Sequence, residues 1–201
     1  GLMVLKDSGI TSIEQLKGKK IGVLKGGNHH YLAVLAIEKA GLSVDDVEWV
    51  YPEDAAQGRS IFETKKVDAL ASYDPFFASA EVELDTLTFT EGVDYQYPNR
   101  TFYYATPDFA KEHADLVDVI LETTDKSDQW ANENKGEVIK IMSKALGIDE
   151  KIVTRQLNRR TFGATKLTQE IVDTQQKQAD KYFEIGLIPK ELDVSKDMPI
   201  N

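Results

Sequence analysis

The chain has 201 residues, of which 41% are hydrophobic and 29% are charged. It is therefore long enough and apolar enough to form one large domain or two small lobes with packed cores. Its formal net charge is −10, and an acidic chain without a basic stripe is not expected to bind nucleic acid. The chain contains no cysteine, which excludes disulfides and thiolate metal sites.

The first residues run directly into a strand-like segment, Leu2–Leu5. A chain that begins inside an element is typical of a fragment, so we expect that a preceding segment and any signal sequence are missing. Residues 9–18 predict a short helical turn that Gly18 ends. No apolar run approaches the roughly 18 residues of a membrane-spanning helix.

From Lys20 to Ala105, short apolar runs alternate with segments of helical period. Strands are expected at Lys20–Leu24, Val47–Tyr51, Ala69–Tyr73, Thr86–Phe89 and Thr101–Ala105. Helices are expected between the first three strands. This repetition with short connections predicts parallel pairing in an α/β lobe with helices covering a small sheet.

From Pro107 onward the pattern is almost entirely helical. Helices are expected from Pro107 to about Asn134, and then over Val138–Leu146, Asp149–Arg159 and Thr168–Ile185. Gly147 and Gly186 are expected to end two of them, because glycine readily adopts the left-handed conformation of a helix C-terminus. The tail Leu192–Asn201 is expected to be extended.

The most informative segment is the turn Gly26–His30, which joins a predicted strand to a predicted helix. Glycines let backbone N–H groups turn toward a ligand, and a helix N-terminus adds unpaired donors and a positive dipole end. Such a turn forms an anion cradle without a charged side chain. The alternative is an ordinary tight turn capped by Asn28. The spacing fits neither a P-loop nor a dinucleotide-binding fingerprint.

The histidines do not predict a metal site. His29 and His30 are adjacent and point about 100° apart on a helix, and His113 lies on a distant helix. A histidine in the first helical turn is better suited to donate a hydrogen bond to a ligand.

Two further places carry candidate binding residues. Tyr73 and Asp74 follow a predicted strand, at the edge where open α/β sheets bind ligands, although Asp74 could simply cap the next helix. Arg100 opens another predicted strand and could pair with an anion through its guanidinium, although a solvated arginine is the simpler interpretation. Without cysteine, a G-x-S-x-G elbow or a Ser/His/Asp order, catalysis is not indicated.

These segments, in this order, resemble the solute-binding proteins of ABC importers. The nearest group is the family of aliphatic-sulfonate, taurine and nitrate binders and yeast-type thiamine-pyrimidine proteins. The resemblance covers essentially the whole chain and rests on a collinear series of motifs: Asp7–Ile10, Leu16–Val23, Lys25–Gly26, His30–Leu32, Lys39–Ser43, Lys66–Ala69, Tyr73–Phe76 and Gly186–Lys190.

The resemblance implies an α/β fold: a periplasmic-binding-protein-like, two-lobe clamp of type II that lacks the N-terminal part of its first lobe. By analogy, residues 1–19 would form a hinge-crossing strand and linker of lobe 1. Residues 20–105 would form the α/β lobe 2, and residues 106–201 a helical return to lobe 1 followed by the C-terminal tail.

The resemblance also implies an extracytoplasmic function, in the periplasm or anchored outside a membrane. The protein would bind a small anionic organic solute, an aliphatic sulfonate or a taurine-like compound, and deliver it to a membrane permease as a monomer. The implied ligand-binding residues are Gly26, Gly27, Asn28, His29, Tyr73, Asp74 and Arg100. No catalytic residue, metal or cofactor is implied.

Two other functions remain open on this scaffold. One is binding or synthesis of a pyrimidine precursor of thiamine, and the absence of cysteine argues against the synthase. The other is a ligand-sensing module of a receptor. The loop also departs from the family, since Gly27 and Asn28 stand where relatives often have serines, which replaces hydroxyl donors by an amide.

Overall fold

The computed structural model describes residues 1–95, 99–198 and 200. The strands are β1 (Leu2–Leu5), β2 (Lys20–Gly22), β3 (Glu48–Val50), β4 (Ala69–Ala71) and β5 (Thr86–Thr90). The helices are α1 (Asn28–Lys39), α2 (Ala55–Glu63), α3 (Phe76–Glu83), α4 (Pro107–Glu112), α5 (Ala114–Glu133), α6 (Lys135–Leu146), α7 (Glu150–Asn158) and α8 (Gln169–Glu184). Short 3-10 turns include Ile13–Leu16, inside the predicted turn.

The chain forms two compact units. The first unit comprises Gly1–Asn99 and Gln178–Leu192, and the second comprises Arg100–Lys177 and Asp193–Asn201. Helix α8 contributes residues to both. The expected division at residues 19/20 and 105/106 concerns the lobes of a longer protein and stays a prediction.

The first unit is built on one five-stranded sheet with the order β3-β2-β4-β1-β5. Strand β2 pairs in parallel with both β3 and β4, which confirms the parallel pairing predicted from the strand–helix repetition. Strand β1 pairs antiparallel with β4 and β5, so the sheet is mixed. The sequence pattern did not predict this, because pairing direction depends on where a strand enters the sheet.

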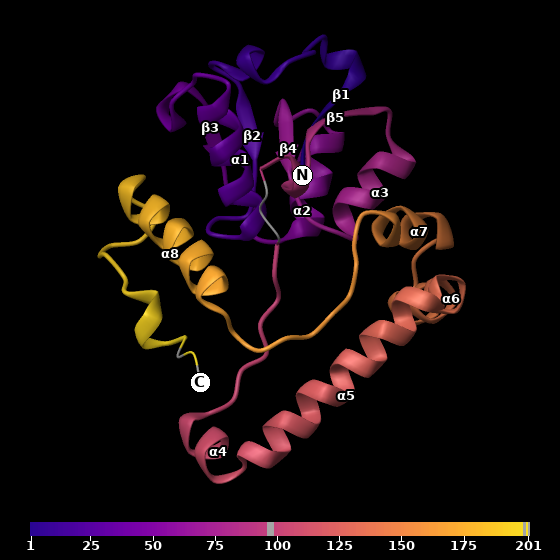
Figure 1. The fold of residues 1–201 in the computed structure, drawn as a ribbon. Helices are drawn as coiled ribbons and strands as arrows, with labels where there is room; N and C mark the ends of the chain where they lie inside the picture. The colour runs from indigo at the N-terminus through magenta and orange to yellow at the C-terminus, as the bar shows by residue number, and fades with distance from the viewer. Residues whose placement is uncertain (96–98, 199, 201) are drawn as a thin grey trace. The chain divides into compact units, whose positions relative to one another are not determined.

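Helices cover both faces of this sheet (Figure 1). Along β1, Leu2 and Val4 pack on the side of α1, whereas Met3 packs on the side of α2 and α3. All three side chains are fully buried. This is the period-two alternation of a strand buried on both faces. Phe62 of α2 and Phe77 of α3 complete the second layer with Met3.

The second unit is helical. Its core joins Val138 of α6 with Val153 and Leu157 of α7. Gly147 ends α6 in the left-handed conformation, as predicted. The Thr168 hydroxyl accepts from the Ile171 N–H at the start of α8. Within the described residues, no helix combines the length and apolarity needed to cross a membrane.

Two predicted elements are wrong. Residues 101–105 form no strand, and Tyr103 and Tyr104 are largely exposed, because no neighbouring strand is present to pair with them in this part of the described chain. The helix expected from Pro107 to about Asn134 is interrupted at His113, whose φ and ψ are −131° and 43°. Neither glycine nor proline marks this break, so no local pattern predicts it.

We expect Phe62→Ala to lower the free energy of unfolding of the first unit by about 3–5 kcal/mol, because it leaves a cavity beside Met3 and Phe77. Urea denaturation measures this. The control Val119→Ala removes a side chain that is 57% exposed on α5 and should change stability by less than about 0.5 kcal/mol. Equal effects of the two substitutions would contradict this packing.

Candidate ligand-binding site

The candidate site lies where parallel strands of the first unit end. Strands β2 and β4 run side by side in register, with Ile21 opposite Ala69. The loop that follows β2 and the segment Tyr73–Asp74 that follows β4 therefore start from the same sheet edge. Ligands of open α/β sheets bind beyond the carboxyl ends of such strands.

Side chains hold the backbone of the loop before α1. Gly26 has a φ of +78°, which glycine adopts without steric cost. Its N–H donates to Nδ1 of His30 at 3.1 Å. The Gly27 carbonyl accepts from the Tyr182 hydroxyl at 2.8 Å and from the N–H of His30 in the first helical turn.

Two backbone donors of the loop remain for a ligand. The N–H groups of Gly27 and His29 form no hydrogen bond with any described residue. They stand at the N-terminus of the 12-residue helix α1, where the helix dipole favours negative charge. The predicted anion cradle thus has donors, and the alternative of a turn capped by the Asn28 side chain is not observed, since Gly27 occupies the N-cap.

The His29 imidazole lies against this loop. It is 8% exposed, and a Cβ added at Gly27 would collide with its ring. On its other side it packs 5.1 Å from the ring centroid of Tyr73. Its Nε2 is buried without a partner among the described residues. A buried imidazole nitrogen with an unmet hydrogen-bonding capacity is suited to bind a ligand atom.

His30 is fully buried among aromatic rings. Its ring centroid lies 5.0 Å from Trp49, 5.6 Å from Tyr51 and 6.1 Å from Tyr182. Because Nδ1 accepts the Gly26 N–H, a neutral ring must carry its proton on Nε2. Burial lowers the pKa of His30, and likewise that of His29, from 6.5 to about 4. Both imidazoles are therefore neutral at pH 7.

Asn28 faces neighbouring amides. Its Nδ2 donates to Oδ1 of Asn99 at 2.8 Å, and its Oδ1 accepts from Nε2 of Gln178 at 3.4 Å. Asn99 and Gln178 are the residues at which the chain leaves and re-enters the first unit. The predicted binding residue thus has a structural role at the helix start.

Tyr73 and Asp74 differ in their surroundings. Tyr73 is 41% exposed beside His29 and Phe76. The Asp74 carboxylate accepts from the Ala78 N–H at 3.0 Å near the start of α3, although Pro75 occupies the N-cap of that helix. That Asp74 contacts a ligand stays a prediction. A cis peptide bond joins Asp74 to Pro75.

Arg100 belongs to the second unit. Its Nη2 pairs with Oε1 of Glu170 at 3.2 Å, and its Nη1 is buried without a partner among the described residues. The structure therefore groups Gly26, Gly27, Asn28, His29, Tyr73 and Asp74 in one unit and Arg100 in the other. That Arg100 faces a ligand stays a prediction.

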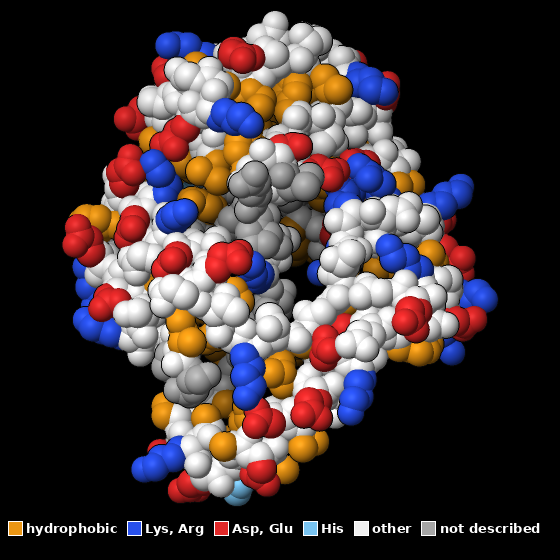
Figure 2. Space-filling view, in the orientation of Figure 1, with side chains coloured by type: hydrophobic (Ala, Val, Ile, Leu, Met, Phe, Trp, Pro, Cys, Tyr) orange, Lys and Arg blue, Asp and Glu red, His pale blue; other side chains and the backbone are white. Residues whose placement is uncertain are grey.

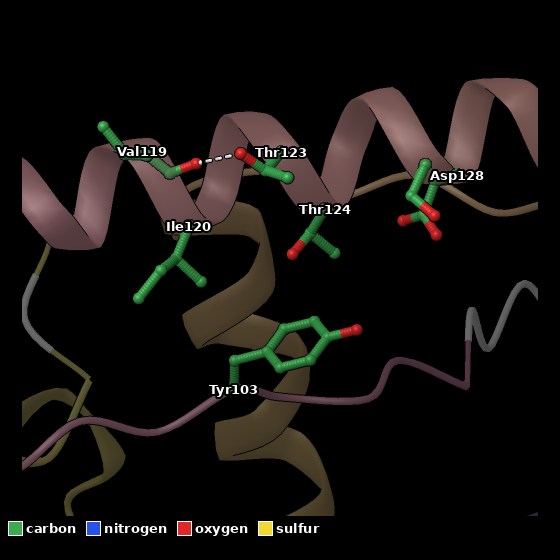
Figure 3. Close-up of a pocket in the computed structure, with 7 residues that line it drawn as sticks. Tyr103, Val119, Ile120, Thr123, Thr124 and Asp128 are labelled. Atoms are coloured by element: carbon green, nitrogen blue, oxygen red, sulfur yellow. Dashed lines mark hydrogen bonds between the residues drawn. The ribbon is translucent and has the colours of Figure 1, made fainter.

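The second unit has its own hollow, of about 440 Å³, between α5 and the preceding segment. In Figure 3 the ring of Tyr103 lies opposite Ile120 and Thr124 of α5. Tyr103, Val119 and Ile120 are each more than half exposed, and the only charged lining residue is Asp128. This open hollow, with one carboxylate and no basic side chain in its lining, is a poor site for an anion.

Sequence reasoning missed two residues that hold the loop. A histidine in the first helical turn is expected to donate to a ligand, whereas His30 accepts from the Gly26 N–H. Tyr182 lies 155 residues from Gly27, and no local pattern links the two. Among the described residues, no group of three or more histidines and carboxylates could hold a metal ion. On the face drawn in Figure 2, acidic and basic side chains are interspersed.

The two imidazoles predict a loss of stability in acid. In the unfolded chain each imidazole takes up a proton near pH 6.5, whereas in the folded chain it does so near pH 4. The contribution of each is therefore intact above about pH 7 and falls by up to about 3 kcal/mol as the pH drops to 4.

Urea denaturation at several pH values between 4 and 7.5 measures this loss, and NMR of the imidazole C–H groups assigns it. His29→Asn and His30→Asn cannot titrate and should each flatten the dependence. An imidazole at either position that titrates near pH 6.5 in the folded protein would refute the expectation.

The comparisons with known proteins agree with the predicted resemblance. The chain is 28% identical over 196 residues to the "Putative aliphatic sulfonates-binding protein" of Escherichia coli strain K12, covering 96% of this chain. It is 30% identical over 203 residues to the protein of the same name in Bacillus subtilis strain 168, covering all of this chain. The chain spans 60% of the length of each of these relatives.

Solved structures place the fold in the same group. The crystal structure of the periplasmic aliphatic sulphonate binding protein SsuA from Escherichia coli superposes with a TM-score of 0.89 at 25% identity, over 98% of this chain and 64% of that chain. The desulfurization enzyme DSZB shares the fold, with a TM-score of 0.69 at 17% identity over 100% of this chain and 73% of that chain. The expected α/β, periplasmic-binding-protein-like fold is confirmed.

The family itself is defined by sequence. The model of the family described as "NMT1/THI5 like" matches residues 1–138, which include both sheet-edge segments of the candidate site. Because this match covers most of the chain, the chain belongs to the NMT1/THI5-like family.

Proposed function

We propose that this chain is part of the extracytoplasmic substrate-binding component of an ABC importer. It binds a small anionic organic solute, an aliphatic sulfonate or a taurine-like compound. The relatives named for aliphatic sulfonates support the ligand class. The proposal includes a permease as partner and a periplasmic or membrane-anchored, extracellular location for the whole protein.

One observation carries the proposal. The N–H groups of Gly27 and His29 have no partner within the described residues, and the buried Nε2 of His29 lies beside them. Three donors at a helix N-terminus suit the oxygens of an anionic head group, because the positive end of the dipole and the N–H groups act together. The chain's net charge of −10 does not prevent this, since nearby dipoles outweigh distant, screened charges.

The neutrality of the imidazoles supports a ligand that is already fully ionised. Neutral His29 can donate one hydrogen bond through Nε2 but supplies no positive charge. A sulfonate keeps its negative charge at every physiological pH and needs no proton from the site. The exposed ring of Tyr73 lies where it can contact the apolar part of such a solute.

Arg100 remains a proposed ligand contact. Its buried Nη1, which has no partner among the described residues, is a charged donor suited to the same head group. In a hinged clamp, a ligand that contacts both lobes stabilises the closed form by its higher affinity for that form.

Binding is favoured over catalysis. The chain has no cysteine, and the two site histidines have a pKa of about 4, so neither is poised to exchange protons near neutral pH. The likeness to the desulfurization enzyme extends to the fold alone.

The proposal is tested by isothermal titration calorimetry of the full-length protein with ethanesulfonate, taurine, nitrate and hydroxymethylpyrimidine. We expect saturable binding of ethanesulfonate or taurine. His29→Phe, which keeps an aromatic ring but removes the donor, should weaken that binding about tenfold or more, as expected for a hydrogen bond to a charged group.

The matched control is His113→Phe, at the break between α4 and α5, which should leave the affinity unchanged. Binding of the pyrimidine alone would favour a thiamine-precursor function instead. Binding of none of these solutes by a cooperatively folded protein would refute the proposal.

A further inference from the structure

We propose that His30 and Tyr182 are positioning residues that fix the loop so that the Gly27 N–H is presented to the ligand beside the N–H of His29. This inference rests on the proposed function for the identity of the ligand. Its structural part, the holding of the peptide planes on either side of the Gly27 amide, can be tested in the ligand-free protein.

The first contact lies on one side of the Gly26–Gly27 peptide group. The Gly26 N–H, which belongs to the preceding peptide group, donates to His30 Nδ1 at 3.1 Å. This bond closes a ring between the loop and the first turn of α1. It takes the Gly26 amide away from any ligand and fixes the orientation of that peptide plane.

The second contact lies on the other side. The Gly27 carbonyl, which belongs to the following peptide group, accepts from the Tyr182 hydroxyl at 2.8 Å. Tyr182 is 7% exposed and packs edge-on against Tyr31. The hydroxyl therefore comes from a fixed ring, and the peptide plane after Gly27 is also held.

The peptide group between these two planes joins Gly26 to Gly27. Its N–H, that of Gly27, has no partner among the described residues. With both flanking planes held by side chains, this N–H can turn only by a concerted rotation about ψ of Gly26 and φ of Gly27. A donor that is oriented before the ligand arrives loses less conformational entropy on binding.

The two holding side chains also contact each other. The ring centroids of His30 and Tyr182 are 6.1 Å apart, and Trp49 packs on His30 at 5.0 Å. The His30 imidazole lowers the stability of the fold, because its Nε2 is buried without a partner in the described chain. A leucine would fill this apolar space without that cost, so the acceptor at Nδ1 is the feature that distinguishes histidine here.

The ligand-free protein gives the first test, by NMR amide exchange and imidazole nitrogen shifts. We expect the Gly26 amide to exchange slowly, the Gly27 amide to exchange fast, and His30 to hold its proton on Nε2. A Gly27 amide as protected as that of Gly26, or a proton on Nδ1 of His30, would overturn the inference.

The second test titrates ethanesulfonate into the wild type and three variants of the holding residues. In the wild type, ethanesulfonate should slow amide exchange at Gly27 and leave amide exchange at Gly26 unchanged. Tyr182→Phe keeps the ring and removes the hydroxyl, so it should weaken binding about threefold to tenfold, the worth of one neutral hydrogen bond. His30→Leu should weaken binding similarly, and His30→Asn, which retains an acceptor near Nδ1, should restore part of it.

Tyr95→Phe is the matched control, because Tyr95 packs in the same apolar cluster as Tyr182 and its ring faces Lys39. It should leave affinity unchanged. Binding that is equally tight in the wild type, Tyr182→Phe and His30→Leu would overturn the inference and leave the proposed function standing. No binding in the wild type, with the expected ligand-free exchange, would refute the proposed function and still support the holding role.

Discussion

The parallel pairing of β2 with β4 is the constraint on which the candidate site depends. Because Ile21 lies opposite Ala69, the two strands end together, and the residues after each strand emerge at the same edge. His29 from the first segment and Tyr73 from the second thereby come within 5.1 Å between ring centroids. A one-residue slip of either strand would turn its side chains to the opposite face.

The pairing of β2 with β4 is stable because the sheet is buried on both faces. Alternate residues of β1 and β4 point into two separate apolar layers, and the helices that form those layers also begin at the site edge. Helix α1 thus has two roles. Its apolar residues anchor it to the sheet, while its first turn carries Asn28, His29 and His30 to the edge. The site is a consequence of how the core packs.

Much of the fold around the candidate site could be predicted from the sequence. The strands at residues 20–24, 47–51 and 69–73 follow from local apolar runs, and the glycine pair after the first of them marks the loop. The predicted strand at residues 101–105 is wrong because a strand forms only beside a neighbouring strand, and residue patterns do not show whether one is present. The antiparallel pairing of β1 was missed because pairing direction also depends on the surrounding sheet.

The chemistry of the loop was only partly predictable. Glycines before a helix expose N–H groups, which predicts donors in the turn Gly26–His30 without saying which amides stay unbonded. It could not predict that His30 would accept from Gly26, since the direction of its ring depends on Trp49 and Tyr51 from elsewhere in the sheet.

The bond between Tyr182 and Gly27 has a consequence for folding. The Tyr182 hydroxyl lies 155 residues after the carbonyl that it holds. A chain that has formed the sheet but not yet docked α8 lacks the group that fixes the Gly27 carbonyl, and closing so long a loop carries an entropic cost. The loop before α1 therefore reaches its final geometry only after the C-terminal part of α8 has docked on the first unit.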